Sequence, residues 1–387
     1  MILTTKVHIA VSTENNVIKN IIIFNALIFL MILFIHFSLM VLKRFFQSSL
    51  QKVTVLCLLV CLPSFAQISN NASNEQLKPL FTISCPNFQQ TVENYQKKFV
   101  VKMENWSSTH LSQAHYQTVF YPFSGPDIVT AMTLYPKANY YVLVADQVPE
   151  YAFIRSPEQL KSSSQEFECQ MLTNYSRRGY YLTNDLIGKN GPKPRFIKLL
   201  IYNLAFAKAQ INEVQILSIN AEGRIFPLVQ GQEPHGVRFL IETKDGRAVT
   251  VDYISANISD SGLKNSPHFV KAFERKSQEA VLIKSASHLL QNSYFSTMKT
   301  ILVERPQWLT QDETGLDIVP LSENYQLQLF GKFITPNRLW EKSPSAQRLA
   351  KYYEDHPSNQ ELPFLLGYEK SGGSMLMIGQ RKKSVKE

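Results

Sequence analysis

Cysteine and the usual signature motifs are scarce in this 387-residue chain, which contains four cysteines, three tryptophans and fifteen glycines. Four cysteines are too few for a small scaffold held by disulfides, and their spacing is not that of a zinc finger. The chain also lacks a basic helix and an RNA-binding aromatic motif, so we expect no nucleic-acid partner. No internal repeat or low-complexity block divides it, and we expect a single domain.

Catalytic and cofactor motifs are missing as well. The sequence has no G-x-G-x-x-G dinucleotide fingerprint, no G-x-S-x-G nucleophile elbow and no HExxH zinc motif. His110 and His115 lie five apart without cysteines nearby. The carboxylates match no calcium loop and are interpreted as solvated loop acids: Asp252, Asp260, Asp312, Glu313 and Asp317. We therefore predict no metal site and no cofactor.

A secretory signal peptide is the clearest feature that is present. From Met40, a basic start precedes the apolar run 53–62, and Ser64 and Ala66 stand at the minus-three and minus-one positions of a cleavage site. Residues 40–66 are therefore predicted to be removed during export. We expect a soluble product that is periplasmic or secreted.

The segment before Met40 has two interpretations. Its apolar stretch 21–42 is long enough to cross a bilayer of roughly 30 Å. Residues 1–39 are rich in Ile, Asn, Phe, Leu and Lys, as expected for AT-rich DNA translated from a start placed too far upstream, and we favour this interpretation. The alternative is an inner-membrane anchor with Lys43 and Arg44 on the cytoplasmic side. The membrane would then be contacted only through this uncleaved segment, ahead of a Rossmann-like domain.

Cleavage would change both the thiols and the charge. It would remove Cys57 and Cys61 and leave Cys85 and Cys169. An oxidising compartment allows these two to form a disulfide, and the alternative is a pair of buried thiols too far apart to bond. The formal charge would fall from +9 to +5, because five basic residues and one acidic residue leave with the peptide.

The rest of the chain is predicted to be one domain with short ends. Residues 67–79 form a polar leader, residues 80–380 a single α/β domain, and residues 381–387 a solvated basic tail.

The first segment with distinctive chemistry is 118–127. It predicts a strand and a glycine-proline turn, followed by a helix at 128–134 and a strand at 140–145. Such a βαβ-like unit places a helix start at the carboxyl end of a sheet, where an anionic or hydroxylated ligand can bind. The candidate ligand contacts are Ser124, Gly125, Asp127 and Asp146. The alternative is a structural turn in which Asp127 caps the helix and Ser124 bonds locally.

Four segments together resemble an uncharacterised family of exported bacterial proteins. They are Phe-Tyr-Pro-Phe-Ser-Gly-Pro-Asp at 120–127, Ser-Asp-Ser-Gly-Leu at 259–263, Lys-Ser-Ala-Ser at 284–287 and Gln-Asp-Glu-Thr-Gly at 311–315. The resemblance covers most of the mature chain and implies export and a single shared domain. It implies no activity and no catalytic residues.

The remaining pattern alternates between helices and strands. Helices are predicted at 195–210, 267–277, 294–303 and 343–353, and strands at 214–219, 237–243, 248–254, 280–283, around Trp308, at 322–333 and, as a final edge strand, at 375–379. Asp245-Gly246 is a strong hairpin signal. We therefore predict an α/β fold with a mixed, largely parallel sheet, flanking helices and at least one antiparallel hairpin, similar in tendency to a Rossmann fold.

A second candidate group lies in the loop that contains Lys284, Ser285 and His288, which offer a cation, a nucleophile and a base. If the loops 255–262, 284–288 and 311–317 share an edge with the Ser124 turn, they form one polar cleft. Two functions follow. One is an exported binding or accessory protein for a small polar or anionic ligand, with Lys284 among its contacts. The other is an extracytoplasmic hydrolase that uses Ser124 or Ser285 with His288 or another base.

Overall fold

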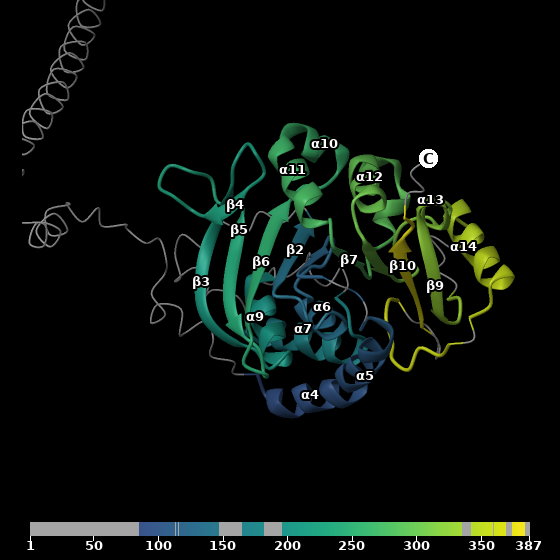
Figure 1. Ribbon diagram of the computed structural model, residues 1–387. Helices are drawn as coiled ribbons and strands as arrows, with labels where there is room; N and C mark the ends of the chain where they lie inside the picture. The colour runs from purple at the N-terminus through teal and green to yellow at the C-terminus, as the bar shows by residue number, and fades with distance from the viewer. Residues whose placement is uncertain are drawn as a thin grey trace, which may run out of the picture. The chain divides into compact units, whose positions relative to one another are not determined.

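The computed structural model describes residues 85–112, 114, 116–146, 165–181, 196–334, 342–358, 360–368 and 374–383, all within the unit Ser69–Glu387 (Figure 1). The predicted upstream extension, signal peptide and polar leader, and the last four residues, lie outside this part, so what the sequence indicates about them stays a prediction. None of the described helices combines the length and the hydropathy that a membrane span requires.

The described residues form an α/β fold around one ten-stranded mixed sheet, as predicted. Its strand order is β4-β3-β5-β6-β2-β1-β7-β8-β10-β9. The strands are β1 (Thr118–Tyr121), β2 (Tyr140–Asp146), β3 (Gln210–Ile219), β4 (Ile225–Pro227), β5 (Gly236–Glu242), β6 (Ala248–Ala256), β7 (Ala280–Ile283), β8 (Trp308–Gln311), β9 (Tyr325–Gly331) and β10 (Met375–Arg381).

The centre of the sheet is parallel and both sides are antiparallel. The strands β6, β2, β1, β7 and β8 run in one direction, whereas β5, β3 and β4 on one side and β10 and β9 on the other pair in antiparallel fashion. The predicted hairpin is β5–β6, and Gly246 adopts a φ of 80° in its turn. The sheet is thus mixed, as predicted, but parallel pairing does not predominate, because only the five central strands are parallel to one another.

Near the C-terminus, one prediction is wrong and another is correct only in part. The strand β10 is not an edge strand, because it lies between β8 and β9. Residues 375–379 are all buried, and a run that is apolar on both faces is typical of an interior strand. The strand predicted at 322–333 starts only at Tyr325, because Asp317 caps a preceding helix by accepting a hydrogen bond from the Val319 amide.

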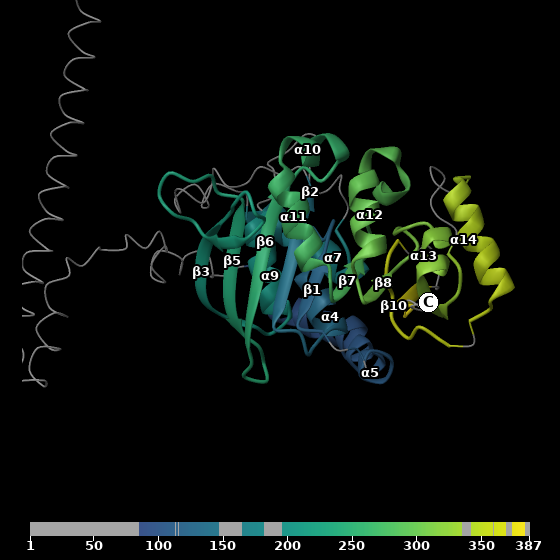
Figure 2. The same ribbon diagram turned by 45° about the horizontal axis from the view of Figure 1, so that its top comes forward.

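Helices cover both faces of the sheet (Figures 1 and 2). One face packs against α4 (Phe88–Tyr95), a π-helical segment (Gln96–Val100), α5 (Val101–His110), α6 (Ile128–Leu134), α7 (Gln165–Arg178) and α9 (Phe196–Phe206). The other packs against α10 (Asp260–Asn265), α11 (Pro267–Lys276) and α12 (Ser296–Glu304), with α13 (Ile318–Asn324) and α14 (Pro344–Asp355) beside β9 and β10. Short 3-10 turns lie at Leu289–Gln291 and Ser293–Phe295.

The strand β1 shows how alternating side chains of one strand contribute to the hydrophobic cores on both faces of the sheet. Its residues Val119 and Tyr121 belong to the core under α6 and α9, whereas Phe120 belongs to the core under α11 and α12. Alternate side chains of a strand point to opposite faces, so a central strand is apolar on both.

The chain changes its direction of winding between β1 and β7. From β1 it passes through α6 on the first face to β2, whereas from β7 it passes through α12 on the opposite face to β8. Since β1 and β7 are parallel neighbours, their loops leave adjacent carboxyl ends in opposite directions. Ligands of open α/β sheets bind in the crevice that forms at such a switch point.

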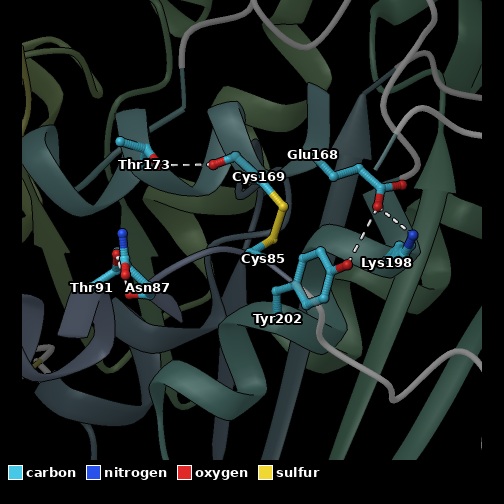
Figure 3. The surroundings of a disulfide bond; sticks show 8 residues. All are labelled: Cys85, Asn87, Thr91, Glu168, Cys169, Thr173, Lys198 and Tyr202. Carbon is cyan, nitrogen blue, oxygen red and sulfur yellow. Dashed lines mark hydrogen bonds and ion pairs between the residues drawn. A yellow bond between two sulfur atoms is a disulfide. The ribbon is translucent and has the colours of Figure 1, made fainter. Parts of the chain in front are cut away.

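Cys85 and Cys169 are joined by a disulfide, with their Cα atoms 5.4 Å apart (Figure 3). The bond ties the residue ahead of α4 to the middle of α7. Beside it, the buried carboxylate of Glu168 pairs with Lys198 and accepts a hydrogen bond from the Tyr202 hydroxyl at 3.4 Å. The prediction that Cys85 and Cys169 can form a disulfide is therefore confirmed.

Candidate functional site

A cavity of about 140 Å³ lies at the carboxyl ends of β1, β2 and β7. Its wall combines the loop after β1, the end of β2, the residues after α7, the start of α9 and the loop after β7. Its polar lining consists of Ser124, Asp127, Asp146, Lys284, Ser285 and Ser287. The backbone of Gly125 also lines it, so the structure brings six of the seven predicted site residues to one cavity. His288, the seventh, is buried in the same loop.

Asp127 has a structural role at the start of α6. Its Oδ1 accepts hydrogen bonds from the Thr130 amide at 3.2 Å and the Tyr175 hydroxyl at 2.7 Å. This is the N-cap arrangement, in which a short acidic side chain satisfies a free amide of the first turn. The helix-capping alternative for Asp127 is therefore correct.

Lys284 forms a buried ion pair with Asp127. Its ammonium lies 2.5 Å from Asp127 Oδ2 and 2.9 Å from Thr130 Oγ1, and it also bonds the carbonyl of Gly179. The Lys284 and Asp127 side chains are only 1% and 4% exposed. Because an ammonium has three donors, all of them are taken. Lys284 is thus neither a surface cation nor the activator of Ser285, and it joins β7 to α6 and the end of α7.

Buried tyrosines complete the surroundings of Asp127. The Tyr121 hydroxyl donates to Asp127 Oδ2 at 3.3 Å, and the Tyr95 hydroxyl donates to that of Tyr175 at 3.0 Å. Burial, reinforced by the charge of Asp127, raises the pKa of all three phenols well above 10. They therefore remain hydrogen-bond donors. Sequence reasoning missed Tyr95 and Tyr175, because they come from distant helices and form no local motif.

Ser124 also bonds locally. Its hydroxyl is within hydrogen-bond distance of the carbonyls of Gly125, at 2.9 Å, and Val144, at 3.3 Å, and its amide donates to Val144 at 3.2 Å. These bonds fasten the β1 loop to β2. The hydroxyl proton points to a carbonyl rather than to a base, so Ser124 is not arranged as a nucleophile.

Asp146 differs from Asp127, because its negative charge has no compensating partner among the described residues. It is the last residue of β2, is partly buried, and accepts one hydrogen bond on Oδ1, from the Ile258 amide at 3.1 Å. Burial raises the pKa of its carboxyl to about 6, and the bond from Ile258 offsets only part of this effect. A half-solvated carboxylate therefore lines the cavity.

Ser285 occupies a strained loop directly after β7. Ser285, Ser287 and His288 have φ values of 51°, 51° and 56°, in the left-handed region that side chains rarely adopt. The Ser285 amide donates to Asp312 Oδ2 at 2.7 Å, and the Tyr368 hydroxyl donates to the Ser285 carbonyl at 3.0 Å. Such strain persists only where the surroundings impose it, and it is frequent at functional sites.

The side chain of Ser285, unlike its backbone, does not take part in the hydrogen bonds that hold the described loop in place. Its hydroxyl is buried and has no hydrogen-bond partner among the described residues. The predicted pairs of Ser285 with Lys284 or His288 are thus not formed. Burial lowers the pKa of His288 to about 4, so its imidazole is neutral.

Asp312 and Glu313 are not solvated loop acids, which corrects that expectation. Both are buried, and burial raises the pKa of each, for Glu313 well above its ordinary value and with Asp312 as a second cause. Asp312 holds the Ser285 amide, and Glu313 Oε1 accepts a hydrogen bond from the Tyr368 amide at 2.9 Å. The acid pair therefore supports the Ser285 loop from two directions.

The other three acids are also bonded within the fold. Asp252 is buried against Arg238, Asp260 accepts the amides of Ser296 and Thr297, and Asp317 pairs with Arg348. No group of three or more metal-binding side chains occurs in the part of the chain that the structure describes.

Two of the four predicted loops, the Ser124 turn and the 284–288 loop, line the same cavity. The other two contact its wall without lining it: the 311–317 loop bonds the 284–288 loop through Asp312, and the 255–262 loop bonds the end of β2 through Ile258. The predicted cleft of four loops is therefore formed only in part.

Comparison with known proteins adds no assignment, because no protein-family model and no curated protein matches the chain. The resemblance of its four motifs to a family of exported proteins stays a prediction.

Proposed function

We propose that this chain is an exported protein that binds a small polar ligand in the cavity between the β1 and β7 loops. The observation that carries the proposal is the pair of polar side chains, Asp146 and Ser285, which line the cavity and are little used by the described scaffold: Asp146 accepts one described hydrogen bond, and the Ser285 hydroxyl makes none. Their neighbours Asp127 and Lys284 are saturated by internal bonds. A buried hydroxyl without a partner and a carboxylate without a cation both reduce stability. A ligand that bonds them offsets this loss.

The position and size of the cavity support a small ligand. It lies at the switch point of the parallel strands, which is where open α/β sheets bind their ligands. Its volume of about 140 Å³ is below the roughly 300–1,000 Å³ usual for larger ligands. A molecule of the size of an amino acid or a monosaccharide therefore matches it.

Thermal shift and calorimetry with a panel of small amines, sugars, carboxylates and phosphates test this proposal. We expect at least one compound to bind, and Asp146→Ala and Ser285→Ala to weaken its binding. Asp355→Ala and Ser293→Ala are matched controls, since both residues are exposed and lie outside the cavity. Binding that is equal in all four variants would place the site elsewhere, and a panel without any binder would contradict the proposal.

A second candidate function is a serine-type hydrolase, and the geometry of Ser285 favours it over Ser124. A left-handed serine directly after a parallel strand, with an unengaged hydroxyl, is the position that a nucleophile occupies in many α/β hydrolases. No described side chain acts as its base, so this function ranks second. Labelling by a fluorophosphonate that Ser285→Ala abolishes and Ser124→Ala preserves would support it.

Export is the remaining part of the proposal. The disulfide between Cys85 and Cys169 is compatible with an oxidising compartment. N-terminal sequencing of the processed protein from cells that express the full chain tests it. We expect the terminus at Gln67, whereas a terminus at Met1 would support the membrane-anchor alternative.

A further inference from the structure

Aromatic rings form part of the cavity wall. Five rings line it, from the end of β1 and the loop after it, from the residues after α7 and from the start of α9: Tyr121, Phe123, Tyr180, Tyr181 and Phe196. Aromatic rings attract cations through the negative charge of their faces, and several rings around one cavity form the type of cage that holds quaternary ammonium groups.

The charges around the cavity also favour a cation. The positive charge of Lys284 is cancelled by Asp127 at 2.5 Å, and its three donors are occupied. Asp146 has no such partner among the described residues, and its one described hydrogen bond comes from the backbone of Ile258. The lining residues therefore carry a net negative charge, which repels an anion and attracts a cation.

We infer that the ligand is a small organic ammonium cation and that Asp146 is the residue that selects it. This inference rests on the proposed function, because it names the chemical class of the molecule that the same cavity binds. In the complex, the Asp146 carboxylate faces the positive charge while the aromatic rings cover the alkyl groups around the nitrogen. A ligand of similar shape without the charge gains only the apolar contacts, and an anion meets a partly buried like charge.

Three probes of nearly equal shape separate charge from size. They are choline, its neutral analogue in which carbon replaces the quaternary nitrogen, and the tert-butylacetate anion. Each is titrated into the purified protein at neutral pH and followed by calorimetry or ligand-observed NMR. We expect choline to bind at least about tenfold more tightly than the neutral analogue, and the anion to bind least.

The variant Asp146→Asn preserves the shape of the side chain and removes its charge. We expect it to abolish the advantage of choline and to leave the affinity of the neutral analogue within about twofold. Asp355→Asn, an exposed carboxylate paired with Lys351 on α14, is the matched control and should leave all affinities unchanged. A variant that merely disturbed the fold would weaken all probes together.

Protonation of Asp146 gives a second readout. The charged groups that line the cavity besides Asp146 are Asp127 and Lys284, which neutralise each other. Burial raises the pKa of the Tyr121 and Tyr181 phenols, which therefore stay protonated and neutral. The carboxyl of Asp146 has a pKa of about 6, so the preference for choline should disappear below about pH 5. The neutral analogue should show no such pH dependence.

The outcomes separate this inference from the proposed function. Equal binding of choline and the neutral analogue, tightest binding of the anion, or no binding of choline while another panel compound binds would overturn the inference and leave the cavity as a ligand site. If no probe and no panel compound binds, the proposed function fails as well.

Discussion

Asp127 and Asp146 show, at the scale of single residues, how two carboxylates of one cavity take different roles. Asp127 is saturated by an amide, two phenols and an ammonium group, whereas Asp146 accepts a single described bond. The motif that contains Asp127 is the more conspicuous in the sequence. Lys284 and Tyr175 reach Asp127 from segments far along the chain and occupy its carboxylate. The carboxylate that is still able to bond a ligand is therefore that of Asp146.

A charge kept for binding should reduce the stability of the free protein. The pKa of Asp146 is about 6 in the fold and 3.8 in the unfolded reference, so its stabilising contribution is full below about pH 4 and lost as the pH rises through 6. We expect Asp146→Asn to raise the free energy of unfolding by roughly 1–2 kcal/mol at about pH 8 and to change it little at about pH 4. Urea unfolding at both pH values measures this. A loss of stability at pH 8 would instead identify Asp146 as a structural ion-pair member.

Breaking the buried pair of Lys284 and Asp127 should lower the free energy of unfolding, whereas removing the charge of Asp146 should raise it. Replacing one member leaves an uncompensated charge inside the protein, so Lys284→Met should destabilise by about 3–5 kcal/mol. Lys351→Met is the matched control, because Lys351 and Asp355 form an exposed pair, and it should cost less than about 1 kcal/mol. Chemical unfolding of both variants measures the difference. Equal effects would show that the Lys284 pair is not a structural centre.

At the scale of elements, the sequence predicted correctly the bounds of those helices and strands that are determined by residues within the segment itself. The helix 128–134 and the strand 280–283 have the predicted bounds, because capping, burial and β-branched residues lie within each segment. The neighbours of β10 and the burial of Asp312 could not be predicted in this way. Both depend on residues that pack from elsewhere, such as β9 against β10 and Tyr368 beside Glu313.

The support of the Ser285 loop should depend on pH. Burial and the nearby Asp312 raise the pKa of Glu313 well above its ordinary value, and Tyr353 and Tyr368 also face it. The stability that protonated Glu313 contributes is therefore lost as the pH rises through its raised pKa. We expect the wild type to lose stability as the pH rises above the ordinary range of a carboxyl group, and Glu313→Gln, which stays neutral, to lose less. Thermal unfolding of both proteins from acidic to alkaline pH checks this, and parallel profiles would contradict it.

At the scale of the whole molecule, one covalent bond restrains a long part of the chain. The disulfide joins residues 84 positions apart, from the start of the described chain to the helix α7 that leads into the cavity wall. The predicted cleavage of the signal peptide would leave Cys85 and Cys169 as the only pair of cysteines. The sequence could not show their proximity, which depends on α4 packing against α7.

Removing this bond should destabilise the protein without changing its fold. In the chain-entropy account, closing a loop of this length is worth about 4–5 kcal/mol. We expect Cys85→Ala/Cys169→Ala to lower the free energy of unfolding by roughly that amount, measured by urea unfolding with unchanged far-UV circular dichroism. Reductant should shift the wild type toward the variant and leave the variant unaffected. An unchanged urea midpoint would show that the disulfide does not restrain the unfolded chain.

The central claim is that the cavity between the β1 and β7 loops is the binding site, and hydrogen exchange with the tightest-binding compound tests it most directly. The account predicts that the ligand slows amide exchange in the loops at 122–128 and 284–289 and at the end of β2, and that Asp146→Asn removes this protection. Protection confined to another part of the molecule would contradict it.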